Sequence, residues 1–70
     1  MLVKLGWYVA LYDQSINGIM IKEGYEVYVP AIMINEERKY SYVKVRINKE
    51  QEYMMSLDTF LSRFVRSREQ

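Results

Sequence analysis

The chain has 70 residues, of which half are apolar, and its ten basic and nine acidic side chains give a net charge of +1. This length makes a single domain, residues 1–70, and the apolar content excludes intrinsic disorder. Because there is no cysteine and no histidine, disulfides and nearly every common zinc, copper or iron site are excluded, so we expect no metal and no cofactor.

The first expected element is a strand over residues 3–12, where side chains alternate with a period of two. One face would carry Val3, Leu5, Trp7, Val9 and Leu11, and the other Lys4, Gly6, Tyr8, Ala10 and Tyr12. Such alternation is typical of a half-buried strand. Residues 13–18 then predict a tight turn, since Asn17 and Gly18 both tolerate positive φ angles.

Residues 19–21 form a short apolar piece, and Lys22-Glu23-Gly24 predicts the next bend. Residues 25–34 predict a strand that is apolar on both faces, with Val27, Val29, Ala31 and Met33 on one face and Tyr28, Pro30, Ile32 and Ile34 on the other. Because proline has no amide hydrogen to donate to a sheet, this segment is either an edge strand or is interrupted by a bulge near Pro30.

After a polar turn, residues 38–47 predict another strand. Its inward face would carry Ser41, Val43, Val45 and Ile47, and its outward face Arg38, Tyr40, Tyr42, Lys44 and Arg46. Two long strands joined by a short polar turn indicate an antiparallel hairpin, and residues 48–50 turn the chain again.

The last third carries a helical pattern. The spacing of an amphipathic helix is followed by Leu57, Phe60, Leu61, Phe64 and Val65, with Asp58, Thr59, Ser62, Arg63 and Arg66 on the polar side. Residues 50–55 have two interpretations. They form a short strand before a helix that Ser56 or Asp58 caps, which we favour, or they begin one continuous helix capped by Asn48.

These elements predict a mainly β (α+β) domain, an antiparallel barrel or roll of four or five strands with a C-terminal amphipathic helix. The Lys22-Glu23-Gly24 turn, the strand that begins Tyr25-Glu26-Val27 and the ending at residues 52–60 resemble small SH3-like barrels of Gram-positive bacteria and their phages. The resemblance covers residues 19–64 and implies a binding module without a particular ligand, such as a phage-type regulator that inhibits a host protein. Residues 61–68 extend past the usual end of such barrels and indicate a longer helix.

Little in the sequence points to catalysis. No histidine or cysteine is present as a general base or nucleophile, and the isolated glycines Gly6, Gly18 and Gly24 form no phosphate-binding loop. We therefore expect that the protein is not an enzyme. The chain start lacks a signal-peptide pattern, and the longest uncharged run, residues 27–35, is far below the roughly 20 residues that span a bilayer. A cytoplasmic protein without membrane contact is expected.

The outward row of the third long strand, Arg38, Tyr40, Tyr42, Lys44 and Arg46, is a candidate nucleic-acid surface. Tyrosines can stack on unpaired bases while the cations meet phosphates. The same residue types are also ordinary on the solvated face of an antiparallel sheet. Residues 38–70 have a net charge of +4, but residues 1–37 offset it with −3, so nucleic-acid binding is the alternative function.

The leading hypothesis comes from the doubly apolar strand. A helix covers only one of its faces, so Tyr28, Ile32 and Ile34 need a cover: the wall of a curled barrel, a second copy or another protein. An edge strand there can also pair with a copy of itself. We therefore expect a non-enzymatic protein-interaction module that binds another protein and forms a homodimer, through Tyr28, Ile32 and Ile34 first and through Tyr40 and Tyr42 second.

Overall fold

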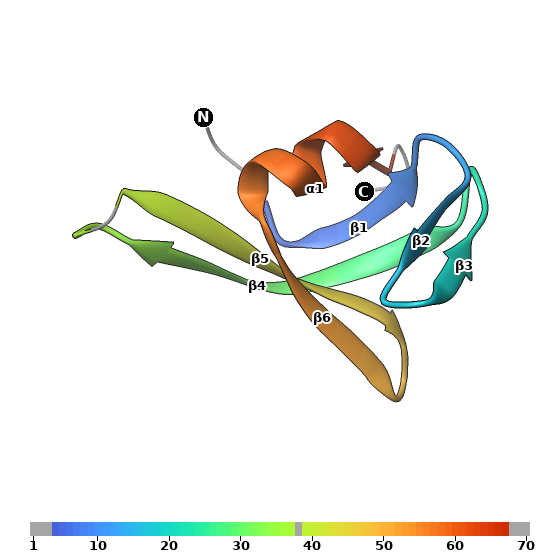
Figure 1. The fold of residues 1–70 in the computed structure, drawn as a ribbon, viewed down its shortest axis with the longest axis horizontal. Coiled ribbons are helices and arrows are strands. Elements are labelled where there is room, and N and C mark those ends of the chain that lie inside the picture. Colours follow the sequence, from blue (N-terminus) through green and yellow to red (C-terminus); the bar gives the residue numbers. More distant parts are fainter. Residues whose placement is uncertain (1–3, 38, 68–70) are drawn as a thin grey trace.

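The computed structural model describes residues 4–37 and 39–67, and this part of the chain folds into two antiparallel sheets and a short helix (Figure 1). In chain order the elements are β1 (Gly6–Ala10), β2 (Gln14–Ile16), β3 (Ile19–Ile21), β4 (Glu26–Asn35), β5 (Tyr40–Asn48), β6 (Gln51–Ser56), α1 (Leu57–Arg63) and β7 (Phe64–Arg66). The larger sheet has the strand order β6-β5-β4-β1-β7, and β2 and β3 form a separate hairpin.

The expectation of a mainly β domain with antiparallel strands and a helix near the C-terminus is confirmed. The barrel form of that expectation is not, because the larger sheet does not close on itself. Its first strand in space, β6, pairs only with β5, and its last, β7, pairs only with β1. The β2–β3 hairpin pairs with neither edge, so the described sheet stays open on both sides.

One face of the larger sheet, called the inner face here, is covered by α1 and by the β2–β3 hairpin (Figure 1). The core between these layers consists of buried side chains from both sheets and the helix, namely Tyr8, Ala10, Ile16, Ile21, Val27, Val29, Val43, Val45, Ile47, Phe60 and Phe64. Phe60 lies at its centre. Its ring centroid is 4.8 Å from that of Tyr8 and 5.0 Å from that of Phe64.

The predicted tight turn joins β2 to β3. Asn17 and Gly18 have φ angles of 51° and 85°, and the flanking residues Ile16 and Ile19 are paired across the hairpin. Two consecutive positive φ angles match the twist of a two-residue hairpin, which explains why Asn-Gly is favoured here.

Strand β1 presents to the core the face that looks less apolar in the sequence. Gly6, Tyr8 and Ala10 are buried, whereas Trp7 is 45% exposed. The small side chain of Ala10 lies opposite Phe64 of β7 and leaves room for that ring. The Tyr8 hydroxyl donates a hydrogen bond to the Lys4 carbonyl oxygen at 2.6 Å, so its polar atom is satisfied next to the core.

Strand β4 contains the bulge that Pro30 predicts. Tyr28 pairs with Arg46 of β5, but the next registered pair joins Ala31 to Lys44, so β4 has one extra residue between the pairs. The alternative of an edge strand is wrong for the first half of β4, which lies between β1 and β5 as far as Val29. The extra residue reverses the alternation, so every later side chain of β4 lies on the face opposite to the one predicted.

After β5 the chain first adopts the favoured arrangement, a short strand followed by a helix that a side chain caps. Residues 51–56 form the strand β6, and Ser56 caps α1 by accepting a hydrogen bond from the Thr59 amide at 3.3 Å. The prediction that the helix continues to Val65 and beyond is wrong, because α1 ends at Arg63. Phe64–Arg66 instead form β7, which pairs with β1, and the Leu11 amide donates to the Arg63 carbonyl oxygen at 2.9 Å.

The Ser56 cap yields a first testable prediction. Substituting Ser56→Ala removes the acceptor for the Thr59 amide and is expected to lower the free energy of unfolding by about 1 kcal/mol, measured by urea denaturation. Ser62→Ala is the matched control, since the Ser62 hydroxyl only donates to the Thr59 carbonyl oxygen within the helix. Equal losses in both variants would show that the cap does not stabilise α1.

Candidate functional site

The other face of the larger sheet, called the outer face here, is covered by no element of residues 4–37 and 39–67. Strand register places one set of side chains on it, namely Trp7, Val9, Glu26, Tyr28, Ala31, Met33, Asn35, Tyr40, Tyr42, Lys44, Arg46, Glu52, Met54, Ser56 and Val65. Most of this set is apolar or aromatic. An antiparallel sheet face that meets water normally carries mostly polar side chains, so the composition of the outer face needs an explanation.

A row of interacting side chains crosses four strands at the middle of the outer face. Trp7, Tyr28, Arg46 and Glu52 are successive partners in the register of β1, β4, β5 and β6. The Trp7 and Tyr28 rings meet edge to face, with centroids 5.1 Å apart. The Arg46 guanidinium lies 5.9 Å from the Tyr28 ring centre and donates from Nε to Glu52 Oε2 at 2.6 Å. These contacts hold the two rings in fixed positions on the sheet.

A second aromatic group lies on the distal half of the β4–β5 hairpin, which projects away from the rest of the molecule (Figure 1). The Tyr40 and Tyr42 rings meet edge to face at a centroid distance of 4.9 Å, and Met33 is the cross-strand partner of Tyr42. All three side chains are exposed. A two-stranded hairpin has no hydrophobic core of its own that could cover these side chains. They therefore form an exposed apolar surface on which a partner can dock.

The structure brings together only part of the predicted partner surface. Tyr28, Tyr40 and Tyr42 share the outer face. Ile32 and Ile34 do not, because the bulge turns them to the inner side, where Ile32 packs against the core and Ile34 is 70% exposed. The predicted surface is therefore split between two faces of the sheet.

Sequence reasoning missed several outer-face residues, namely Trp7, Met33, Met54 and Val65. Trp7 was assigned to the apolar side of its strand, which looked like the core side. Met33 was assigned to the face opposite Tyr28, because simple alternation of side chains along the strand takes no account of a bulge. A signal that points to the exposure of Trp7 is the pair of small residues on the opposite side of β1, Gly6 and Ala10, because Ala10 leaves room for the Phe64 ring.

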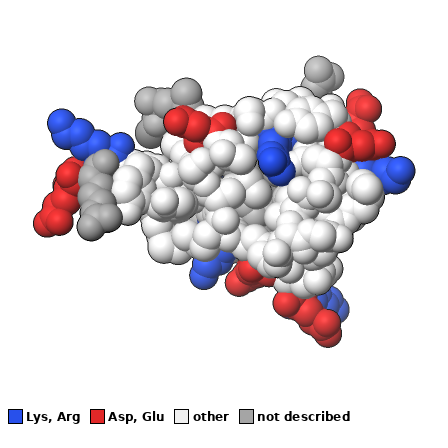
Figure 2. All heavy atoms as spheres, in the orientation of Figure 1, with Lys and Arg blue, Asp and Glu red and all other residues white. Residues whose placement is uncertain are grey.

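The row proposed for nucleic-acid binding lies on the outer face from Tyr40 to Arg46, whereas Arg38 lies outside the described residues. The cation Arg46 is engaged by Glu52, and Lys44 forms no ion pair within the described part of the chain. Two carboxylates, Glu26 and Glu52, share the face, so its charge is balanced. On the side of the molecule drawn in Figure 2, acidic and basic side chains lie mostly around the rim and both signs occur along it.

The described residues contain no cluster of three or more acidic, histidine or cysteine side chains placed to hold a metal ion. Within the same residues, no helix combines the length and the apolar character needed to cross a membrane. That the protein is not an enzyme stays a prediction.

Comparison of the chain with models of protein families, with curated proteins and with solved structures finds no match. The resemblance to SH3-like barrels therefore stays a prediction.

Proposed function

We propose that the protein is a non-enzymatic interaction module that docks another protein chain on its outer face, and that a second copy of itself is one such chain. The observation that carries the proposal is the large apolar and aromatic surface that the sheet turns away from α1. Contiguous exposed apolar patches on small domains mark interaction sites.

The size of the domain supports the same conclusion. A chain of this length buries only about 60% of the surface that its unfolded state exposes, and without cysteine it has no disulfide to add stability. Docking of the outer face would bury Trp7 and Tyr28, and aromatic rings contribute most of the binding energy in many protein interfaces.

Charge and shape favour a second copy as the occupant. The outer face carries two cations, Lys44 and Arg46, and two carboxylates, Glu26 and Glu52, so two copies placed face to face do not repel each other. Two antiparallel sheets pack well face to face at a spacing of about 10 Å. A two-fold axis would place the same patch on both sides of the interface.

Trp7 reports directly on this proposal because it is the single tryptophan of the chain and lies half-exposed on the outer face. Its fluorescence should shift to shorter wavelength, and its quenching by acrylamide should fall, as protein concentration rises from about 1 μM to about 1 mM. Dimers that form through the sheet edges would leave Trp7 in water, and its quenching would then stay constant while the molar mass increased.

The nucleic-acid alternative predicts a different result from the same protein. Titration with an oligothymidylate single strand of roughly 15 nucleotides would give binding that weakens steeply with salt and is lost in the variant Tyr40→Ala/Tyr42→Ala. Apolar docking predicts no such binding. A salt-dependent complex that needs both tyrosines would replace the present proposal.

A further inference from the structure

Strand β6 is an open edge of the larger sheet. It pairs with β5 on one side, and the backbone hydrogen bonds that connect separate elements involve none of its residues. Within residues 4–37 and 39–67, the free side of β6 therefore presents unpaired amide and carbonyl groups at alternate residues of a six-residue strand about 20 Å long.

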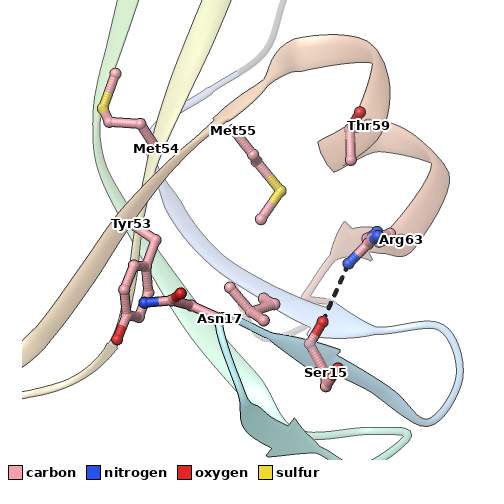
Figure 3. A pocket seen from close by; sticks show the side chains of 8 residues that line it. Ser15, Asn17, Tyr53, Met54, Met55, Thr59 and Arg63 are labelled. Atoms are coloured by element: carbon pink, nitrogen blue, oxygen red, sulfur yellow. Dashed lines mark hydrogen bonds between the residues drawn. The ribbon is translucent and has the colours of Figure 1, made fainter.

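A slot with a volume of about 480 Å³ lies beside this edge. Its walls come from three elements: Tyr53, Met54 and Met55 of β6, Ser15, Ile16 and Asn17 at the end of the β2–β3 hairpin, and Thr59 and Arg63 of α1 (Figure 3). This volume falls within the range of protein ligand sites, roughly 300 to 1,000 Å³. The slot thus lies between the free edge of β6 and the end of the β2–β3 hairpin.

Arg63 is the one charged residue that lines the slot. Within the described residues its guanidinium has no carboxylate partner, and its hydrogen bond to the Ser15 carbonyl oxygen is long at 3.4 Å (Figure 3). Its backbone is held in place, because the Arg63 carbonyl oxygen accepts from the Leu11 amide and from Gln14 Nε2. An anchored arginine without a counter-ion favours an anionic group in the slot, with which it forms charge-assisted hydrogen bonds.

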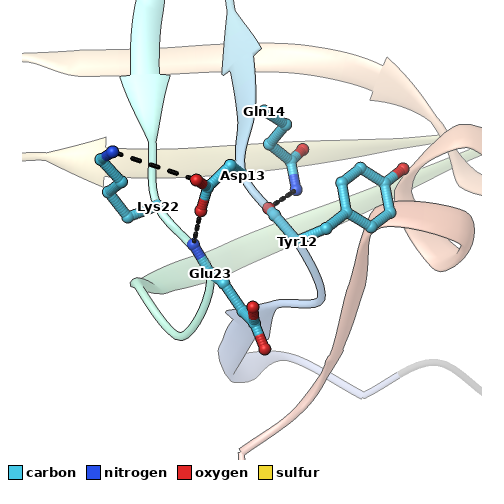
Figure 4. Close-up of polar contacts among 5 residues, drawn as sticks. All are labelled: Tyr12, Asp13, Gln14, Lys22 and Glu23. Atoms are coloured by element: carbon cyan, nitrogen blue, oxygen red, sulfur yellow. Dashed lines mark hydrogen bonds and ion pairs between the residues drawn. The ribbon is translucent and has the colours of Figure 1, made fainter.

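The wall opposite β6 is fixed by contacts at the base of the β2–β3 hairpin (Figure 4). Asp13 Oδ1 accepts from the Glu23 amide at 2.8 Å, and its other carboxylate oxygen lies 3.9 Å from Lys22 Nζ. These contacts join the two strands of the hairpin at its base, and Gln14 Nε2, which donates to the Arg63 carbonyl oxygen at 3.2 Å, connects β2 to the end of α1.

We propose that this slot binds an extended peptide segment that pairs with the free edge of β6 and places a carboxylate side chain against Arg63. Addition of a strand satisfies the unpaired backbone of β6, and alternate side chains of the peptide then point to the inner side, into the slot. The apolar lining from Ile16 and Met55 suits β-branched side chains on either side of the carboxylate. Met54 is the one lining residue that the register also places on the outer face, and binding in the slot does not require docking there.

Blocked heptapeptides of sequence Thr-Val-Thr-X-Thr-Val-Thr test the proposal, with glutamate, glutamine or lysine at X. Titrations of ¹⁵N-labelled protein should shift the amides of residues 51–56 and 15–17. The glutamate peptide should bind at least about tenfold more tightly than the glutamine peptide, and the lysine peptide should not bind.

Arg63→Gln should remove the preference for glutamate, and Arg63→Lys, which keeps the charge, should retain part of it. Lys49→Gln in the β5–β6 turn is the control, since it removes one positive charge near β6 without lining the slot. Unfolding curves confirm that each variant is folded. Equal affinity of the glutamate and glutamine peptides, shifts confined to the outer face, or no shift at millimolar peptide would each overturn the proposal and leave the outer-face proposal to its own test.

Discussion

Phe60→Ala is expected to lower the free energy of unfolding by about 3 to 5 kcal/mol, enough to unfold a large share of the molecules. The Phe60 side chain has no exposed surface, and it packs against the rings of Tyr8 and Phe64. A domain of 70 residues has a total stability of roughly 4 to 10 kcal/mol, so this one cavity removes much of it. Urea denaturation followed by circular dichroism measures the loss.

Tyr42→Ala is the matched control for Phe60, because it removes a ring from the outer face and leaves no cavity in the core. Its expected cost is at most about 1 kcal/mol, the value of an exposed cross-strand aromatic pair. The account of the core would be contradicted if the two variants lost equal stability.

Met33→Asp is expected to weaken self-association by at least about 100-fold, which corresponds to about 2.7 kcal/mol. Met33 lies on the outer face beside Tyr42, where a face-to-face dimer would bury it and leave the new carboxylate without a partner. Since Met33 is 43% exposed in one copy, the substitution should cost the monomer little. Dissociation constants from sedimentation equilibrium measure the effect.

Ile34→Asp provides a control one residue away. Ile34 is more exposed than Met33 but lies on the opposite side of the hairpin, so the outer-face proposal predicts no more than a small change in the dissociation constant. The two variants thus distinguish docking on one face from nonspecific association through any apolar side chain of the hairpin. If Ile34→Asp disrupted association and Met33→Asp did not, the interface would lie on the inner side.

Local chemistry in the sequence was sufficient to predict several elements. Asn17-Gly18 predicts its turn because few other pairs adopt two positive φ angles. The alternation in β5 predicts the buried residues Val43, Val45 and Ile47, and Ser56 marks the start of α1. Each of these predictions depends on residues that are close together in the chain.

The orientation of β1 depends on distant residues and could not be predicted in the same way. Leu5, Trp7 and Val9 look like a core face, but the small residues Gly6 and Ala10 are on the side that accepts the helix and its rings. The more apolar side of β1 thus lies on the outer face, which is the surface that the proposed docking would cover.

The bulge in β4 had the largest consequence for the predicted site. Pro30 indicates that a bulge is possible, but it does not indicate on which face of the sheet each later residue lies. One extra residue separates Tyr28 from Ile32 and Ile34 and moves Met33 onto the face of Tyr28. Residue-by-residue assignment of a docking surface therefore needs the strand register.

The end of α1 was mispredicted because Phe64 fits both structures. It occupies an inward position in a helix that continues from Phe60, and it is also inward in β7, opposite Ala10. Val65 distinguishes the two, since a helix would bury it, whereas in β7 it is exposed on the outer face opposite Val9. The local sequence around Phe64 does not show that β1 has backbone amide and carbonyl groups with which β7 can form hydrogen bonds.

The molar mass of the wild-type protein in solution tests the central claim most directly. Light scattering over a concentration series, at about 50 mM and about 500 mM salt, should show a rise from one chain of 8.5 kDa to twice that mass, with the same midpoint at both salt concentrations. A mass of one chain at every concentration would contradict docking of a second copy on the outer face. A midpoint that moved strongly with salt would contradict its apolar character.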